Sequence, residues 1–103
     1  MEPVVTDQKA VGVAHVATPH AQKYLVQLCK HFQHKRPATW GDDRGRIEFS
    51  IGDCDLAAEP AVLHITATAP DAANLPQIED VIARHLLRFA FREELAIEWR
   101  REG

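Results

Sequence analysis

The chain has 103 residues, a formal net charge of −3, and a composition that is 46% hydrophobic and 26% charged. These values describe an ordinary globular domain and exclude wholesale disorder, because a chain of this length can bury one hydrophobic core. No apolar run approaches the ~20 residues that a membrane helix needs. The start of the chain is acidic and lacks the basic and apolar parts of a signal peptide. We therefore expect one cytoplasmic domain over residues 1–103, with about seven frayed residues at the start.

The first third of the chain predicts a strand followed by a helix. Residues 8–17 alternate loosely between apolar and polar side chains, which is typical of a strand. Thr18 precedes Pro19, and this order predicts an N-cap followed by proline at the first helical position. The helix should end near residue 35, because the residue before Pro37 avoids helical conformation. Its buried stripe has the spacing of one helix face, in Ala21, Leu25, Leu28 and Phe32.

Four short strands are predicted in the middle of the chain, at residues 38–40, 46–51, 54–58 and 61–69. The pair Gly52-Asp53 predicts a two-residue hairpin turn. In the last of these strands Leu63 and Ile65 alternate with His64, which indicates one buried face and one wet face.

A second helix and a final strand complete the pattern. The helix should begin near residues 74–76, where Asn74 and Gln77 predict a capping pair, and end near residue 90. Asp71 is the competing cap, but it would place Pro76 inside the helix. Residues 95–99 alternate as a last strand. The order β-α-β-β-β-β-α-β predicts an α+β two-layer sandwich, in which two helices cover one face of an antiparallel-rich sheet.

Several sequence blocks are similar to those of a known family. Residues 24–35 read YLVQLCKHFQHK, and further blocks are GRIEF at 45–49, CDL at 54–56, EDV at 79–81 and RHLLRFAFR at 84–92. From Val11 onward the chain resembles a small bacterial family of unknown function, DUF2218. The resemblance implies no established activity, ligand or catalytic residue. It does imply an association with siderophore-interacting flavoproteins, as fused or neighbouring modules, and hence with iron handling.

Charge is distributed unevenly along the chain. Residues 8–41 contain five lysines and arginines and no acidic residue, whereas residues 42–103 carry a net charge of −6. On a helical wheel the basic side chains lie opposite the apolar stripe of the first helix. This basic face predicts a binding site for an acidic protein or an anionic small ligand, formed by Lys30, His31, His34, Lys35 and Arg36. Two of these residues are histidines, so binding should tighten as the pH falls from about 7 to 6.

A plainer interpretation of the basic face stays open. Cations near the C-terminal end of a helix complement its dipole, so these residues also fit an ordinary solvated surface. His31 and His34 form an i, i+3 pair that is a weaker alternative as a metal site, because zinc normally takes three or four protein ligands. No cofactor is predicted. His85 lies within the apolar stripe of the second helix and predicts a buried imidazole bonded to a carbonyl or carboxylate.

The remaining candidates have structural interpretations. Cys29 and Cys54 fall at inward positions and are expected to be reduced core residues rather than nucleophiles. The acidic doublet Glu93-Glu94 is expected at the surface. If the uncovered sheet face binds something, its polar candidates are His64, Arg46 and Glu48. Because the outward strand positions carry no aromatic ring, nucleic-acid binding is disfavoured.

Known catalytic motifs for nucleophilic serine, phosphate loops, dinucleotides and zinc hydrolases do not occur in the sequence. We therefore expect a non-catalytic accessory module that binds through its basic helix face. The first alternative is an iron- or metal-linked component of a redox system. The second is a structural homodimer formed through the open sheet face.

Overall fold

A computed structural model describes residues 9–102 of the protein. Within this range the elements follow the expected order: β1 (Ala10–Ala17), α1 (Ala21–Phe32), β2 (Ala38–Trp40), β3 (Arg44–Phe49), β4 (Gly52–Glu59), β5 (Val62–Ala69), α2 (Leu75–Phe89) and β6 (Arg100–Glu102).

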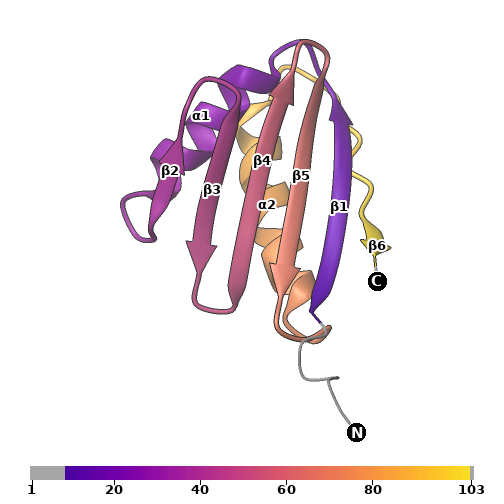
Figure 1. The fold of residues 1–103 in the computed structure, drawn as a ribbon. Coiled ribbons are helices and arrows are strands. Elements are labelled where there is room, and N and C mark those ends of the chain that lie inside the picture. The colour runs from indigo at the N-terminus through magenta and orange to yellow at the C-terminus, as the bar shows by residue number, and fades with distance from the viewer. Residues whose placement is uncertain (1–8, 103) are drawn as a thin grey trace, which may run out of the picture.

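The six strands form one antiparallel sheet in the order β2-β3-β4-β5-β1-β6. Both helices lie behind this sheet in Figure 1, and no described residues cover its front face. The arrangement confirms the predicted α+β sandwich. Neither helix of the described chain is long and apolar enough to cross a membrane.

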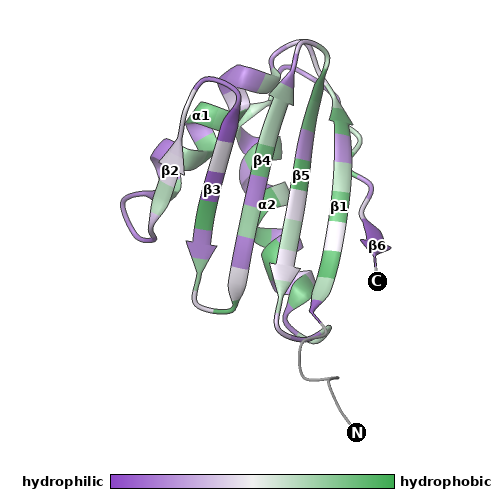
Figure 2. Cartoon of the chain, in the orientation of Figure 1, coloured by the Kyte–Doolittle hydropathy of each residue, from purple (hydrophilic) through white to green (hydrophobic). Residues whose placement is uncertain are grey.

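The hydrophobic core fills the space between the sheet and the two helices. Figure 2 shows the alternation of apolar and polar residues along the strands. The sheet contributes side chains that are at most 2% exposed, among them Ile47, Leu56, Leu63 and Ile65. The helices contribute Leu25, Leu28, Ile78, Ile82 and Leu86. Burial of each such side chain contributes about 1.5–3 kcal/mol, so the covered face dominates the stability of the fold.

Helix α1 is shorter than predicted at both ends. Its N-cap is His20, whose amide donates to Thr18 Oγ1 at 3.0 Å, so Thr18 fixes the preceding turn instead of capping the helix itself. The helix ends at Phe32 rather than near residue 35. The amides of Lys35 and Arg36 both donate to the Phe32 carbonyl oxygen, at 2.9 and 2.7 Å, and this tight turn leads the chain into the following proline.

The β3–β4 hairpin turns two residues earlier than predicted. Phe49 pairs with Gly52, so the turn is Ser50-Ile51 and Gly52 belongs to β4. Gly52 has a φ of +149°. A Cβ at this position would lie 2.1 Å from the Thr68 carbonyl oxygen. The glycine is therefore required for backbone conformation and for close contact with β5, and not for the turn.

Helix α2 begins where the sequence predicts, with Asn74 as its N-cap. The expected side-chain pair with Gln77 is absent, because Gln77 donates its amide to the Asn74 carbonyl oxygen at 3.2 Å. Instead the amide and the side-chain nitrogen of Asn74 both donate to Asp71 Oδ1, at 3.0 and 3.1 Å. Asp71 thus stabilises the turn before the helix and leaves Pro76 in the first turn.

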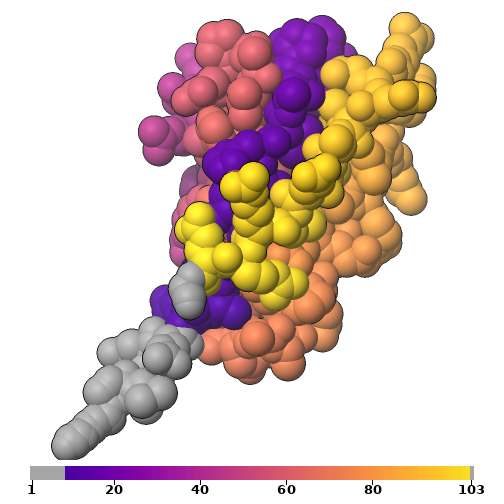
Figure 3. All heavy atoms as spheres, turned by 90° about the vertical axis from the view of Figure 1, so that its right-hand side faces the viewer, coloured from indigo at the N-terminus to yellow at the C-terminus, as the bar shows by residue number. Residues whose placement is uncertain are grey.

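The predicted final strand is displaced towards the C-terminus. Residues 95–99 alternate in burial as expected, with Leu95, Ile97 and Trp99 packed against the core, but they form no strand. Strand β6 pairs only with residues 11–13 of β1. Figure 3 shows the C-terminal segment crossing the β1 edge of the sandwich beside α2. The alternation therefore reports which side chains are buried and not which backbone groups pair.

Candidate functional site

The predicted basic face lies at the end of α1 and in the turn that follows. Lys30, His31, His34 and Lys35 are exposed. Arg36 is half-buried, and its Nε donates to the Glu48 carbonyl oxygen at 3.2 Å. This bond ties the turn to β3.

His31 does not lie opposite the buried stripe, as the helical wheel predicts, but on the flank of α1 that faces α2. Its ring centroid lies 4.7 Å from that of His85 and 5.7 Å from that of Phe89. His31 therefore makes the basic face continuous with the second helix.

His85 is half-buried between the two helices, whereas its sequence pattern predicts full burial. Its Nδ1 lies 2.7 Å from the Val81 carbonyl oxygen, which confirms the expected carbonyl partner. The ring also packs 4.8 Å from the Phe32 ring. The side chain thus fills the junction between the helices.

The electrostatics of His31 identify a further member of the basic group. Partial burial, and then the neighbouring basic groups His85, Lys35, His34 and Arg88, lower the pKa of His31. Arg88 comes from the last turn of α2 and is not among the residues that the sequence predicts for the basic face. Its position three residues after His85 was the available signal, because i and i+3 lie on one helix face.

We call this group the helix seam: Lys30, His31, His34, Lys35, Arg36 and Arg88. None of the ion pairs formed between residues 9–102 involves a member of the seam. Within the same range, no three His, Cys, Asp or Glu side chains are placed to hold one metal ion. His31 and His34 therefore gain no third protein ligand from the described chain.

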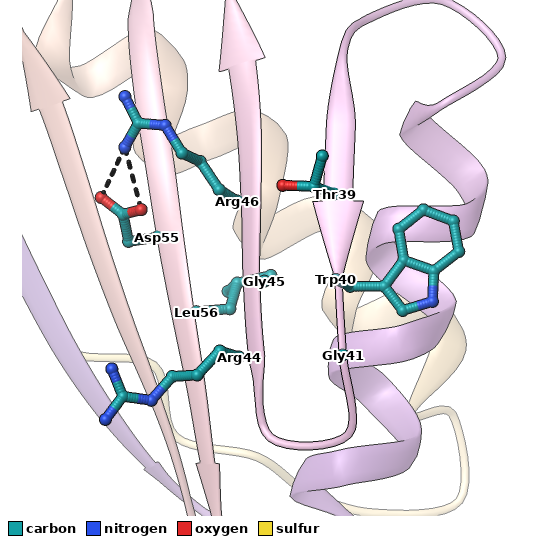
Figure 4. A pocket seen from close by; sticks show the side chains of 8 residues that line it. All are labelled: Thr39, Trp40, Gly41, Arg44, Gly45, Arg46, Asp55 and Leu56. Atoms are coloured by element: carbon teal, nitrogen blue, oxygen red, sulfur yellow. Dashed lines mark hydrogen bonds and ion pairs between the residues drawn. The ribbon is translucent and has the colours of Figure 1, made fainter.

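The uncovered sheet face carries a second polar group. Arg46 donates to Asp55 at 2.9 and 3.0 Å (Figure 4). It also donates to Asp53 at 2.6 Å, and these bonds join β3 to β4 across the face. A depression of about 480 Å³ lies beside this network, and Arg44 and Thr39 also line it. Trp40 points away from the arginines towards α1 in this view. Arg46 is thus neutralised by its own chain, unlike the helix seam.

The two cysteines are fully buried and free of disulfide bonds. Burial raises the pKa of Cys29 to about 11 and raises that of Cys54 further. Both thiols therefore stay protonated at neutral pH, which agrees with a core role and not with a nucleophile.

Glu93 is a structural residue and not part of a surface doublet. Its carboxylate accepts hydrogen bonds from Thr18 Oγ1 at 3.0 Å and from the Tyr24 hydroxyl. The bond from Tyr24 is the main cause that lowers the pKa of Glu93, whereas burial is the main cause that raises the pKa of Tyr24 to about 12. These bonds fasten the chain after α2 to the start of α1.

Comparison with known proteins places the chain in a family. The model of a family described as an uncharacterised protein conserved in bacteria, DUF2218, matches residues 13–100. No curated protein matches the chain. The structure is similar to the NMR structure of PA4090 from Pseudomonas aeruginosa, with a TM-score of 0.75 and 36% identity over 87% of this chain and 94% of that chain. The chain therefore belongs to the uncharacterised bacterial family DUF2218.

Proposed function

We propose that this domain is a non-catalytic binding module whose helix seam captures an acidic partner or an anionic ligand. One observation supports the proposal. Lys35 of the turn after α1 and Arg88 of α2 both lie near His31, and within residues 9–102 no carboxylate forms an ion pair with any seam residue. Of the basic side chains elsewhere on the described surface, Arg46, Arg84 and Arg101 each pair with a carboxylate, whereas Arg44 forms no ion pair with another described residue.

The mechanism is charge complementarity spread over several contacts. An exposed ion pair contributes only about 0.2–1 kcal/mol, so one carboxylate on the partner is not enough. A segment with several acidic groups in a row can meet several seam residues at once. The resulting association should be fast and should weaken as salt rises.

The seam also predicts a response to pH. Partial burial and the neighbouring basic groups lower the pKa of His31 in the free protein, which favours the neutral ring. A bound anion favours the protonated ring and raises that pKa. Binding therefore takes up a proton at His31 and should tighten as the pH falls.

The test is an NMR titration of the isotope-labelled protein at low salt with an oligoglutamate peptide, and separately with inorganic phosphate. We expect chemical-shift changes centred on residues 30–36 and on Arg88. The double variant Lys30→Glu with Lys35→Glu should weaken binding of the peptide at least tenfold and leave the melting temperature nearly unchanged, because both side chains are exposed.

The matched control is Lys9→Glu with Lys23→Glu, which makes the same change in net charge outside the seam. Equal binding by the seam variant and the control would show that only overall charge matters and would overturn the proposal. The metal-linked alternative makes a different prediction, namely that untagged protein holds a stoichiometric metal that is lost from the double variant His31→Ala with His34→Ala.

A further inference from the structure

Two histidines that lie far apart in sequence meet on the uncovered sheet face. His15 of β1 and His64 of β5 are direct partners in the antiparallel register. Their Nδ1 atoms are 2.6 Å apart, and their rings are nearly perpendicular, with an interplanar angle of 78°. The strand register thus aims one nitrogen of each imidazole at the same point.

A third side chain, the carboxylate of Glu59, lies next to this pair. Glu59 Oε1 lies 3.4 Å from Nε2 of His64, on the opposite side of the ring from His15. A carboxylate in this place favours a proton on Nε2, so Nδ1 of His64 presents a lone pair. In that tautomer of His64, the 2.6 Å contact is a hydrogen bond that Nδ1 of His15 donates and Nδ1 of His64 accepts.

We propose that His15 and His64 bind a divalent cation of the class that prefers imidazole, such as Zn²⁺ or Cu²⁺. In metal sites, a ligating histidine typically donates its other ring nitrogen to a carboxylate, which orients the ring and raises its basicity. Glu59 is placed to accept such a bond from Nε2 of His64. The pair therefore has two converging donors and a supporting carboxylate.

Small movements of the two rings bring their Nδ1 atoms to the spacing that two ligands of one metal ion require. Two nitrogens each about 2.0–2.1 Å from a tetrahedral zinc ion are about 3.3 Å apart, so the rings must separate by about 0.7 Å. His15 is exposed, and the His64 side chain is 30% exposed, so both rings have room to turn. The proton that His15 holds on Nδ1 moves through solvent to its Nε2. No net proton is then released, and both lone pairs point at the ion.

The remaining coordination positions face solvent. No third protein ligand is placed to share the ion among residues 9–102. The position beside His64 on β4 is Ala57, whose small side chain does not block the pair. Water, or a donor atom of a second molecule, therefore completes the coordination. This site lies on the sheet face opposite the helices and is independent of the helix seam.

The test is a calorimetric titration of untagged, metal-free protein with ZnCl₂ and with CuCl₂. One ion should bind per chain, and the copper complex should show nitrogen couplings in its electron paramagnetic resonance spectrum. His15→Ala and His64→Ala should each weaken binding at least about tenfold, and Glu59→Gln by about 10–100-fold, the usual effect of losing a supporting carboxylate.

The matched control is His31→Ala with His34→Ala, which removes two histidines from α1 and should leave metal binding unchanged. Binding that survives the loss of both His15 and His64, or that disappears in the α1 variant, overturns the proposal. So does the absence of binding by the native protein. The seam variant Lys30→Glu with Lys35→Glu should bind the metal normally, so failure of the proposed anion site is distinguishable from failure of this one.

Discussion

The two faces of the sheet are built from the same strands and have opposite characters. The covered face presents Ile47 and Leu56, which are 2% exposed or less, to the helices. The uncovered face presents Arg46 bonded to Asp55, and His15 bonded to His64. On the covered face, the stabilising free energy comes from close packing of side chains and from the exclusion of water from apolar surface. On the uncovered face, the stabilising free energy comes from hydrogen bonds and ion pairs between side chains of neighbouring strands, which are individually weak but chemically specific.

We expect the largest loss of folding stability from Gly52→Ala, on the covered face. The new Cβ would lie 2.1 Å from a backbone oxygen and 2.6 Å from Ile78 Cδ1, at a φ of +149°. Backbone strain and overpacking each cost about 1–3 kcal/mol, so unfolding in urea should show a loss of about 3 kcal/mol or more. Gly41→Ala is the control, because a Cβ there meets no atom within 4 Å. Similar stability of the two variants would contradict the role of Gly52.

We expect a smaller loss of folding stability from Arg101→Ala, at the edge of the covered face. Arg101 donates to Glu79 Oε1 at 2.8 Å, and the Glu79 side chain is only 7% exposed. Removal of the arginine leaves a buried carboxylate without its cation, which should cost about 1–3 kcal/mol at pH 7.

The pH dependence of this variant gives a sharper test. Burial raises the pKa of Glu79 above 4.5, and Arg101 opposes that rise. Because the folded protein holds this proton more tightly than the unfolded chain, charged Glu79 lowers stability as the pH rises through its folded pKa. The loss caused by Arg101→Ala should thus be largest near pH 7 and should shrink as the pH falls through the raised pKa of Glu79 towards 4.5. The neighbouring Arg100→Ala, measured in the same way, should show no such trend.

The smallest effect is expected on the uncovered face, from Arg46→Ala. The Arg46 side chain is 43% exposed, so solvent screens its pairs with Asp53 and Asp55, and the loss should be about 1 kcal/mol or less. The effect should decrease further in high salt. Arg44→Ala on the same strand is the control, since Arg44 forms no ion pair with another described residue. A loss as large as that of Gly52→Ala would remove the contrast between the faces.

The sequence predicts the fold well because it encodes side-chain burial. Alternation in β3 and β5 and the stripe of α1 correctly identify the residues that face the core. Alternation also predicts the burial of Leu95 and Trp99, but these residues do not pair as a strand. Backbone pairing of the C-terminal segment depends on which edge of β1 is free, and a local sequence pattern does not predict that.

The candidate sites were predictable to different degrees. Five basic residues of the seam lie within residues 30–36, so the charge pattern of the sequence finds them, although only Lys30 and His31 belong to α1. Arg88 belongs to another helix, and only the fold brings it near His31. The pair of His15 and His64 depends on a strand register that joins residues 49 positions apart. Such a site becomes visible only when the order of the strands is known.

The lengths of the outer strands have a consequence for self-association. The sheet ends in β2 on one side and β6 on the other, and each has only three residues. Short terminal strands offer few unpaired backbone groups to a neighbouring molecule. Removal of the last residues of the described chain would uncover residues 11–13 of the eight-residue strand β1. Strand β6 thus occupies backbone groups of β1 that could otherwise pair with a neighbouring molecule and lead to aggregation.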